Sequence, residues 1–519
     1  MEILSVKEMY QADRAAMEGG VASLDLMEAA GAAVAVAIEE RWDKRPVCVL
    51  AGPGNNGGDG YVVARLLKTA GWDVTVYQLG EKNALSGDAA VNAKLWRAKV
   101  RPLDDALDLI AGQGEGDSLL VVDALFGAGL SRPLEGTARI LAELLTVSQA
   151  QGNAPLVVAV DVPSGLHGDT ARAMGADKKS TGVCFHADLT VTFCRAKPAH
   201  VLLPGRSLCG EVVVADIGIA DAEVDRVAPM AWINGVGLWR DAFPDVLEDA
   251  NKYARGHLVV LGGAGMTGAA RLAAMGGRRA GAGLVTIACP DKAFAVYAAA
   301  TQPGTLIQPF RSGKDFAAIL ADARKTTMVL GPGAGVAKAT RQKILAALAA
   351  GKRCVLDADA LTVFRDAPKA LFRAVSGRAH PDLSDVVLTP HGGEFPRLFP
   401  DLAKKYAAAK LGKIEATREA ARRSGCVVLY KGPSTVVAAP DGRAAVTVNA
   451  PQWLATAGSG DVLAGMIGAL LAQGMPAFEA ANAAAWMHGE AAMSAGPGLI
   501  AEDLPDALPE IVAWLIQQL

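Results

Sequence analysis

Short runs of aliphatic and β-branched residues alternate with alanine-rich stretches along almost the whole chain of 519 residues. Runs such as Pro46–Ala51 and Leu156–Asp161 are apolar nearly throughout, as expected of strands buried on both faces of a sheet. The stretches between the runs have the length and composition of helices. The alternation therefore predicts an α/β fold in which helices pack on parallel sheets.

The alternation stops once, between about residues 221 and 253, where two tryptophans, two prolines and scattered charges follow no period. A chain of this length also exceeds what one ordinary hydrophobic core supports. We therefore expect an N-terminal domain over residues 1–220, a junction over 221–250 and a C-terminal domain over 251–519. The expected strands are Pro46–Ala51, Asp73–Gln78, Leu119–Asp123, Leu156–Asp161, His257–Leu261, Leu284–Ala288, Thr327–Leu330, Cys354–Leu356, Val386–Leu388, Val427–Tyr430 and Thr435–Ala439, and the expected helices include Tyr61–Ala70 and Thr267–Ala280.

Composition narrows the class of partner. The net charge is -3, with acidic and basic residues mixed, so neither a nucleic acid nor a membrane surface is indicated as a partner. The apolar stretch Val462–Met475 is shorter than the roughly 20 residues that span a bilayer, and the N-terminus lacks a signal pattern. Seven scattered cysteines form no CxxC pair, which argues against a disulfide framework or a zinc cluster. We expect a cytoplasmic enzyme; the alanine- and glycine-rich composition leaves a homo-oligomer open.

The segment Gly52–Gly60 reads Gly-Pro-Gly-Asn-Asn-Gly-Gly-Asp-Gly and separates an expected strand from an expected helix. Such a turn can direct backbone N–H groups toward an anion at the N-terminus of the helix. The alternative is an ordinary tight turn with an Asn or Asp cap. Paired asparagines, paired glycines and an aspartate within nine residues favour a binding site.

Two further strand ends in the first half carry polar side chains, namely Asp123 in one and Asp161 with Ser164 in the other. Ligands of open parallel sheets bind at the carboxyl ends of the strands, so these groups should converge there. An isolated aspartate at a strand end is more often a helix cap. Hard oxygen ligands without Cys or His favour an alkali or alkaline-earth cation over zinc. Asp161 is the candidate acid/base, because partial withdrawal from water can move a carboxyl pKa toward neutrality.

In the second half, Thr456–Gly465 contains a Gly-Ser-Gly-Asp turn that leads into an apolar helix. Such a turn offers amides to a transferring phosphoryl group, and its aspartate, Asp461, can accept a proton from the attacking hydroxyl. Gly-Asp also makes ordinary helix caps. No Walker GxxxxGK[ST] loop occurs. The companion motifs at other expected strand ends and around the first helix of this half are Lys431–Thr435, Leu388–Glu394, Gly331–Gly335, Gly262–Ala270 and Arg279–Thr286.

These motifs carry a resemblance to a known family. With the segments Leu26–Gly31 and Thr192–Pro198, most of residues 1–220 resembles the NAD(P)HX epimerases, and nearly all of residues 225–519 resembles the ADP- or ATP-dependent NAD(P)HX dehydratases. The resemblance implies a Rossmann-like three-layer domain followed by a ribokinase-like α/β domain. It implies a bifunctional NAD(P)H-hydrate repair enzyme, which epimerises R- and S-NAD(P)HX and dehydrates the S epimer to NAD(P)H. The second reaction would consume ADP (or ATP) and release AMP (or ADP) and phosphate.

The resemblance also implies roles for residues of the first half. Asp161 would be catalytic, with Lys197 orienting it or stabilising charge, and a solvated lysine is the alternative for Lys197. A potassium ion would be held by Asn56, Asp123 and Ser164. The hydrated cofactor would contact Asn55, Asn56, Gly57, Gly58, Asp59, Gly127, Ala128, Gly129, Leu130, Ser131, Arg132, Pro133 and Asp161.

For the second half the implied site has two parts. The residues expected at the adenine nucleotide are Lys431, Gly432, Pro433, Ser434, Thr435 and Gly460. Those expected at the hydrated dinucleotide are Ala269, Gly333, His391 and the catalytic Asp461. Mg²⁺ should accompany the phosphates, with Asp357 and Glu394 as candidates for holding its water. One departure is the segment Gln302–Leu306, which lacks an acidic residue that the family usually carries there.

Two alternative functions stay open. The second half could be a kinase for a sugar or a pyrimidine alcohol, which would release a phosphate ester instead of inorganic phosphate. The first half could be a non-catalytic binding module. The joint presence of Asn56, Asp123, Asp161 and Ser164 argues against the second alternative. The choice between ADP and ATP, with ADP favoured by the domain fusion, and the choice between NADHX and NADPHX also stay open.

Overall fold

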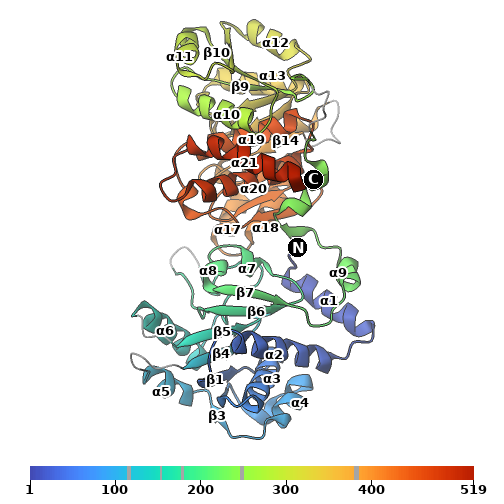
Figure 1. The fold of residues 1–519 in the computed structure, drawn as a ribbon, viewed down its shortest axis with the longest axis vertical. Coiled ribbons are helices and arrows are strands. Elements are labelled where there is room, and N and C mark those ends of the chain that lie inside the picture. The colour runs from blue at the N-terminus through green and yellow to red at the C-terminus, as the bar shows by residue number, and fades with distance from the viewer. Residues whose placement is uncertain (114–118, 152–154, 177–179, 246–250, 379–384, 519) are drawn as a thin grey trace. The chain divides into compact units, whose positions relative to one another are not determined.

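The computed structural model describes residues 1–113, 119–151, 155–176, 180–245, 251–378 and 385–518. The chain divides into two compact units, each with its own sheet (Figure 1). The first unit comprises Met1–Ala231 with Tyr406–Gly412, and the second comprises Trp232–Lys405 with Lys413–Leu519. Among the described helices, none combines the length and the apolarity that a membrane span requires.

The sheet of the first unit has the strand order β3-β2-β1-β4-β5-β6-β7, and all neighbouring strands are parallel. Its strands are β1 (Pro46–Ala51), β2 (Asp73–Gln78), β3 (Val100–Pro102), β4 (Leu120–Ala124), β5 (Leu156–Val160), β6 (Leu189–Phe193) and β7 (Glu211–Ala215). The first six strands follow the order of a Rossmann fold, with the switch point between β1 and β4. The predicted Rossmann-like domain is confirmed.

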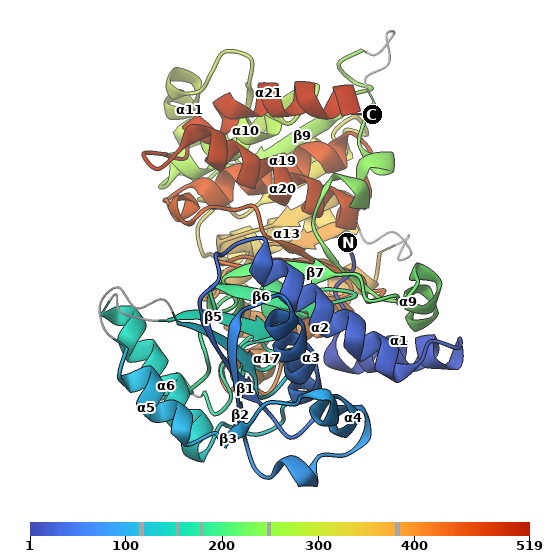
Figure 2. The ribbon, with the colours of Figure 1, turned by 60° about the horizontal axis from the view of Figure 1, so that its bottom comes forward.

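Helices cover both faces of this sheet, because alternate residues of each strand point to opposite sides. In β1, Val47 and Val49 belong to one core, whereas Cys48 and Leu50 belong to another. Helices α2, α3 and α4 lie on the first side and α5 and α6 on the second (Figures 1 and 2). The helices of the unit are α1 (Val6–Glu18), α2 (Ser23–Glu39), α3 (Asn55–Thr69), α4 (Gly87–Leu95), α5 (Asp105–Ala111), α6 (Gly136–Ala150), α7 (Pro198–Val201), α8 (Gly205–Leu208) and α9 (Asp221–Val227).

Helix α3 begins at Asn55, six positions before the expected start at Tyr61, so that prediction was wrong. The glycines that suggested a turn instead allow the first turn of the helix to pack against the loop after β1. A Cβ on Gly57 would lie 2.0 Å from the carbonyl oxygen of Gly52. Close packing here, not backbone freedom, explains the glycine at this position.

The second unit has a ten-stranded sheet with the order β11-β10-β9-β12-β13-β14-β15-β16-β17-β8. Pairing is parallel from β11 to β15, and β16 runs antiparallel to both of its neighbours. The strands are β8 (Ala231–Ile233), β9 (His257–Leu261), β10 (Leu284–Pro290), β11 (Leu306–Phe310), β12 (Thr327–Leu330), β13 (Arg353–Leu356), β14 (Val386–Leu388), β15 (Val427–Tyr430), β16 (Thr435–Ala438) and β17 (Ala444–Thr447). The predicted α/β fold is confirmed for this unit also.

The main core of the second unit lies where α10, α19, α20 and α21 gather on one face of the sheet (Figures 1 and 2). Helices α10 and α19 pack at close range through glycines, since a Cβ on Gly465 would lie 1.9 Å from the carbonyl oxygen of Ala273. The helices of the unit are α10 (Thr267–Arg279), α11 (Phe294–Ala300), α12 (Gly313–Ala321), α13 (Lys338–Ala349), α14 (Asp359–Thr362), α15 (Pro368–Ser376), α16 (Phe395–Leu398), α17 (Pro400–Ala407), α18 (Lys413–Ser424), α19 (Ser459–Ala472), α20 (Ala477–Ala495) and α21 (Asp503–Gln518).

The aperiodic stretch after residue 220 contains regular structure. It includes helix α9 and the short strand β8, which joins the second sheet beside β17. Asn234 continues this edge, because its backbone N–H donates to the carbonyl oxygen of Val446. A three-residue edge strand leaves too few residues for a period-2 pattern to be visible in the sequence.

Candidate active sites

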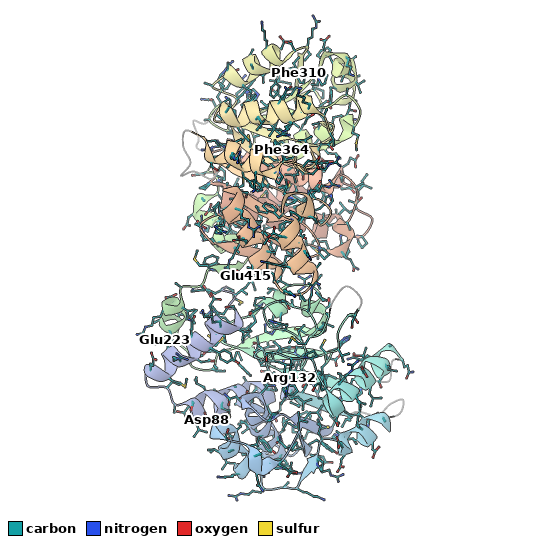
Figure 3. All side chains as sticks on the ribbon, turned by 180° about the vertical axis from the view of Figure 1, so that it is seen from behind. Asp88, Arg132, Glu223, Phe310, Phe364 and Glu415 are labelled. Carbon is teal, nitrogen blue, oxygen red and sulfur yellow. The ribbon has the colours of Figure 1, made fainter. Side chains whose placement is uncertain are left out.

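A cleft of about 830 Å³ opens at the carboxyl ends of β1, β4, β5 and β6 in the first unit. It is the place where a parallel sheet of this order binds ligands. Asp88 and Arg132, two residues of its lining, are labelled in Figure 3. The predicted residues that line the cleft are Asn55, Asn56, Asp59, Gly127, Ala128, Gly129, Leu130, Ser131, Arg132, Asp161 and Lys197.

Five of the predicted residues lie outside the lining. Gly57 and Gly58 are buried within α3, where a Cβ on Gly58 would lie 2.6 Å from the sulfur of Met27. Asp123 and Ser164 are fully buried behind the cleft, and Pro133 lies beyond its edge. Gly57 and Gly58 therefore allow the first turns of α3 to pack closely against their neighbours.

Asp161 is held by three donors immediately after β5. Its Oδ2 accepts from the Ala128 N–H at 2.8 Å, and its Oδ1 lies 3.0 Å from both the Lys197 amine and the Thr192 hydroxyl. Burial alone would raise the pKa of Asp161, but the Lys197 ammonium and the Ala128 N–H outweigh burial and lower it. The expected shift toward neutrality was therefore wrong. Asp161 is an ionised carboxylate at neutral pH.

Lys197 and His200 support this carboxylate. Lys197 is 2% exposed, which excludes a solvated lysine, and its amine also donates to the Thr192 hydroxyl at 2.8 Å. The Lys197 N–H donates to Nδ1 of His200, so Nε2–H of His200 donates to the Asp161 carbonyl at 2.9 Å. Burial lowers the pKa of His200 to about 4, which keeps the ring neutral. The bond holds Asp161 at φ 67°, in the left-handed region, which turns its side chain into the cleft.

Two other carboxyl groups line the same cleft, and their pKa values are raised whereas that of Asp161 is lowered. Burial raises the pKa of Asp13 to about 6, and Asp161 adds to the rise while Lys197 opposes it. Burial and the charges of Asp161 and Asp13 raise the pKa of Asp59 well above its usual value. Asp13 and its neighbour Tyr10 were not predicted as site residues, because α1 carries no binding motif. The only available signal was the Ser5–Glu8 capping box that begins this helix.

Behind the cleft, Asp123 joins the loops that follow β4 and β5. Its two oxygens accept from the Ser164 hydroxyl at 2.6 Å and the Ser164 N–H at 2.7 Å, and burial raises its pKa to about 6. The buried amide nitrogen of Asn56 has no hydrogen-bond partner. Among the described residues, no three His, Cys, Asp or Glu side chains cluster as metal ligands.

In the second unit, Asp461 lies in the first turn of α19, which begins after Gly458 at φ 92°. Burial raises the pKa of Asp461 to about 7, with Asp357 contributing and Lys431 opposing. The Lys431 amine donates to Oδ1 of Asp357 at 2.6 Å, and a Cβ on Gly460 would lie 3.2 Å from this amine. The structure thus brings a carboxylate poised to titrate near neutrality, a cation and a helix N-terminus together.

The segment after β14 contributes His391 and Glu394. The His391 N–H donates to Oε2 of Glu394 at 3.0 Å, and Nε2 of His391 lies 3.3 Å from Oε1 of the same carboxyl. The Gly393 N–H donates to Nδ1 of His391 at 2.8 Å, which leaves Nε2 as the protonated nitrogen. Burial raises the pKa of Glu394. Asp357 lies near this pair, since the Thr389 hydroxyl donates to its Oδ1 at 2.8 Å.

The glycine loops around Gly333 and Gly263 lie against one another. A Cβ on Gly263 would be 1.9 Å from the carbonyl oxygen of Gly333, and one on Gly333 would be 2.2 Å from that of Met266. Ala269 follows in the first turn of α10. The predicted residues Gly333 and Ala269 therefore belong to adjoining backbone segments at the carboxyl ends of β12 and β9.

The two sheets each carry polar groups at their carboxyl strand ends, which is the arrangement of the class of α/β proteins with one ligand site in each unit. Residues 257–512 match the family described as NAD(P)H-hydrate dehydratase, and residues 23–199 match the family described as YjeF-related protein N-terminus. The chain belongs to the family of bifunctional NAD(P)H-hydrate repair enzymes, as its full-length relatives show. The epimerase and dehydratase activities that the sequence implied are thereby confirmed.

The relatives span the whole chain. The bifunctional NAD(P)H-hydrate repair enzyme Nnr of Moorella thermoacetica is 33% identical over 551 residues, covering 100% of this chain and 98% of the relative. The enzyme of the same name from Salinibacter ruber is 35% identical over 549 residues, covering 98% and 96%. Among solved structures, the ADP/ATP-dependent NAD(P)H-hydrate dehydratase of Bacillus subtilis, co-crystallised with ATP/Mg²⁺, covers 55% of this chain and 98% of its own, at 26% identity and a TM-score of 0.46.

Proposed function

We propose that Asp461 is the general base of the dehydratase and that Lys431 with the first turn of α19 holds the phosphates of ADP or ATP. The observation that carries this proposal is the pKa of Asp461, which burial raises to about 7 beside the Lys431 cation. A base with a pKa near the working pH combines availability with proton affinity. Backbone amides at the start of a helix and a fixed cation are suited to phosphoryl oxygens.

Asp461 takes the proton of the C6 hydroxyl of S-NAD(P)HX, and that oxygen attacks the terminal phosphorus, whose bond to the bridging oxygen breaks to release AMP or ADP. The ring nitrogen lone pair then expels phosphate from C6, and loss of a C5 proton restores NAD(P)H. Mg²⁺ bound with the phosphates would neutralise their charge, and it is named with ATP for the Bacillus subtilis structure. The carboxyl oxygens of Asp357 and Glu394 are suited to hold the water molecules bound to this ion.

For the epimerase we propose that Asp161 is the proton acceptor and that Asp13 and Asp59 supply the proton. Loss of hydroxide from C6, assisted by the ring nitrogen, requires an acid, and return of water to the other face requires a base. The three carboxyls line one cleft, and their pKa values move in opposite directions. Groups whose environments separate their pKa values suit the two roles.

Asn56, Asp123 and Ser164 are proposed to hold potassium. The donors fit this ion, because they offer hard oxygens without sulfur or imidazole. The unpartnered amide of Asn56 adds support, since a half-turn of the amide would place its oxygen where the nitrogen now lies. Bound there, the ion would supply positive charge beside the epimerase cleft.

A cytoplasmic location is also proposed. Support comes from the seven cysteines, all of them buried thiols without disulfides. Self-association remains a prediction, and sedimentation of the purified chain tests it.

The test uses a mixture of R- and S-NADHX with ADP or ATP, Mg²⁺ and K⁺, and follows NADH absorbance together with inorganic phosphate. We expect complete conversion by the parent enzyme and none by Asp461→Ala. Asp161→Ala should convert the S epimer at the parent rate and then continue only as fast as the epimers interconvert unaided. Absence of NADH with either nucleotide would refute the assigned roles, and a stable phosphate ester would favour the alcohol-kinase alternative.

A further inference from the structure

A buried lysine lies under the segment that is expected to bind the nucleotide. Lys413 begins α18 and is only 6% exposed; Glu415 of the same helix is labelled in Figure 3. The Lys413 amine donates to the carbonyl oxygen of Ser434 at 2.5 Å and to that of Lys431 at 3.3 Å. The same nitrogen lies 4.3 Å from the centre of the Tyr430 ring. No sequence motif marked this residue.

Burying a lysine opposes its charge, and burial lowers the pKa of Lys413 to about 7. Two carbonyl oxygens and an aromatic face offset this cost, because both stabilise an ammonium group. An apolar side chain of the same length would fill the space without the desolvation cost. What the buried amine binds is the backbone of one short turn.

That turn runs from Lys431 to Ser434, and the amine joins its two ends. Gly432 adopts φ 145°, and a Cβ there would lie 3.2 Å from the Lys413 amine, so the backbone passes directly over the lysine. The Lys431 N–H donates to the Pro390 carbonyl oxygen at 2.9 Å, which anchors the start of the turn to the loop after β14. With its carbonyls drawn toward Lys413, the turn carries the Lys431 side chain to Asp357 and toward Gly460.

We infer that Lys413 is a positioning residue for the dehydratase, whose amine holds the Lys431–Ser434 turn in the shape that binds the adenine nucleotide. The inference rests on the proposed function, in which this turn contacts the nucleotide. Lys413 itself bonds only to backbone oxygens of the turn among the contacts described, so it acts through the turn.

Lys413→Met removes the donors and keeps the length of the side chain. We expect the Kd and KM for ADP or ATP to rise about tenfold, as for the loss of two hydrogen bonds. The kcat at saturating nucleotide and the KM for S-NADHX should change less than about twofold, since neither the base nor the dinucleotide loops are touched. Epimerase activity should equal that of the parent.

The matched control is Lys352→Met. Lys352 is 7% exposed and its amine donates to the Asp322 carbonyl oxygen at 3.1 Å, at the amino ends of β12 and β13, the opposite edge of the sheet from the site. This variant should lose stability to a similar degree and keep nucleotide affinity. In Lys413→Ala, propylammonium should restore affinity, because it can replace the missing amine.

Two outcomes would overturn the inference: parent-like nucleotide affinity in Lys413→Met, or an equal loss of affinity in Lys352→Met. If Lys413→Met does not fold, Lys413→Gln replaces it, and a change in affinity below twofold overturns the inference. Lys431→Met separates this inference from the proposed function. If Lys431→Met binds nucleotide normally, the proposed role of the turn is wrong. If Lys431→Met loses affinity and Lys413→Met does not, only the role of Lys413 is wrong.

Discussion

Asp161 and Asp461 both lie at the carboxyl edge of a sheet, yet their surroundings move their pKa values apart. Asp161 lies 3.0 Å from the Lys197 amine, and this cation outweighs burial. Lys431, whose charge favours ionisation of Asp461, is already bound to Asp357, whose charge opposes it. Both carboxyls are buried, and the partner of the neighbouring lysine contributes to the difference between their pKa values.

The dehydratase should therefore depend on pH through Asp461. Its pKa is raised to about 7, so the carboxylate that acts as base is present above this pH and is lost as the pH falls. We expect kcat/KM for S-NADHX to fall about tenfold per pH unit below pH 7. Stopped-flow rates between about pH 5.5 and about pH 8.5 measure the profile. A midpoint near pH 4, the ordinary value for an aspartate, would contradict the assigned base.

Asp13→Asn should slow epimerisation about 10- to 100-fold, because the variant keeps the size of the side chain and removes a proton donor. The burial-raised pKa of about 6 predicts that epimerisation through Asp13 weakens as the pH rises above this value. The rate is measured by separating the R and S epimers. Glu18→Gln on the same helix, an exposed position, is the control and should retain the parent rate. Equal rates in both variants would leave Asp59 as the only proton donor of the proposal.

At the level of elements, the part of the Gly52–Gly60 segment from Asn55 onward forms the first turns of α3 instead of a loop. Gly57→Ala should destabilise the first unit by about 2 kcal/mol or more, because its Cβ would lie 2.0 Å from the Gly52 carbonyl oxygen. Gly54→Ala is the matched control, since nothing lies within 4 Å of its Cβ and its φ of -113° suits any residue. Urea unfolding of both variants tests the contrast, and equal midpoints would refute it.

The sequence predicted the buried strands well and the contacts between distant segments poorly. The bounds of β1 and β2 agree residue for residue with expectation, because runs buried on both faces are visible as apolar runs. The start of α3 was missed, since glycines that serve packing look like glycines that serve a turn. Asp13 and Lys413 reach their sites through tertiary packing, and neither belongs to a local motif. The direction of the Asp161 pKa depends on Lys197, which only the folded chain brings to it.

At the level of the whole molecule, each unit carries a complete set of groups for its own reaction. The epimerase cleft is lined only by residues of the first unit, and Lys431, Asp357 and Asp461 all belong to the second. The dehydratase uses one epimer, so the two activities together repair the whole mixture. We therefore expect free substrate to pass between the two activities.

A mixture of two variants that each lack one of the two activities should therefore restore complete repair. Asp161→Ala supplies the dehydratase and Asp461→Ala supplies the epimerase, and together they should convert an R/S mixture to NADH at a rate close to that of the parent at equal site concentrations. NADH absorbance after mixing is the measurement, with each variant alone as its control. A mixture no faster than Asp161→Ala alone would show that the sites must share one chain.

The close packing of α10 against α19 has a consequence for how the protein is made. The ribosome must synthesise everything between Arg279 and Ser459 before Gly465 can meet Ala273. Until then the apolar face of β9 lacks the helix that completes its core. The first unit can complete its sheet while synthesis continues, so the second unit is the part of the nascent chain that exposes unpaired apolar surface for longer.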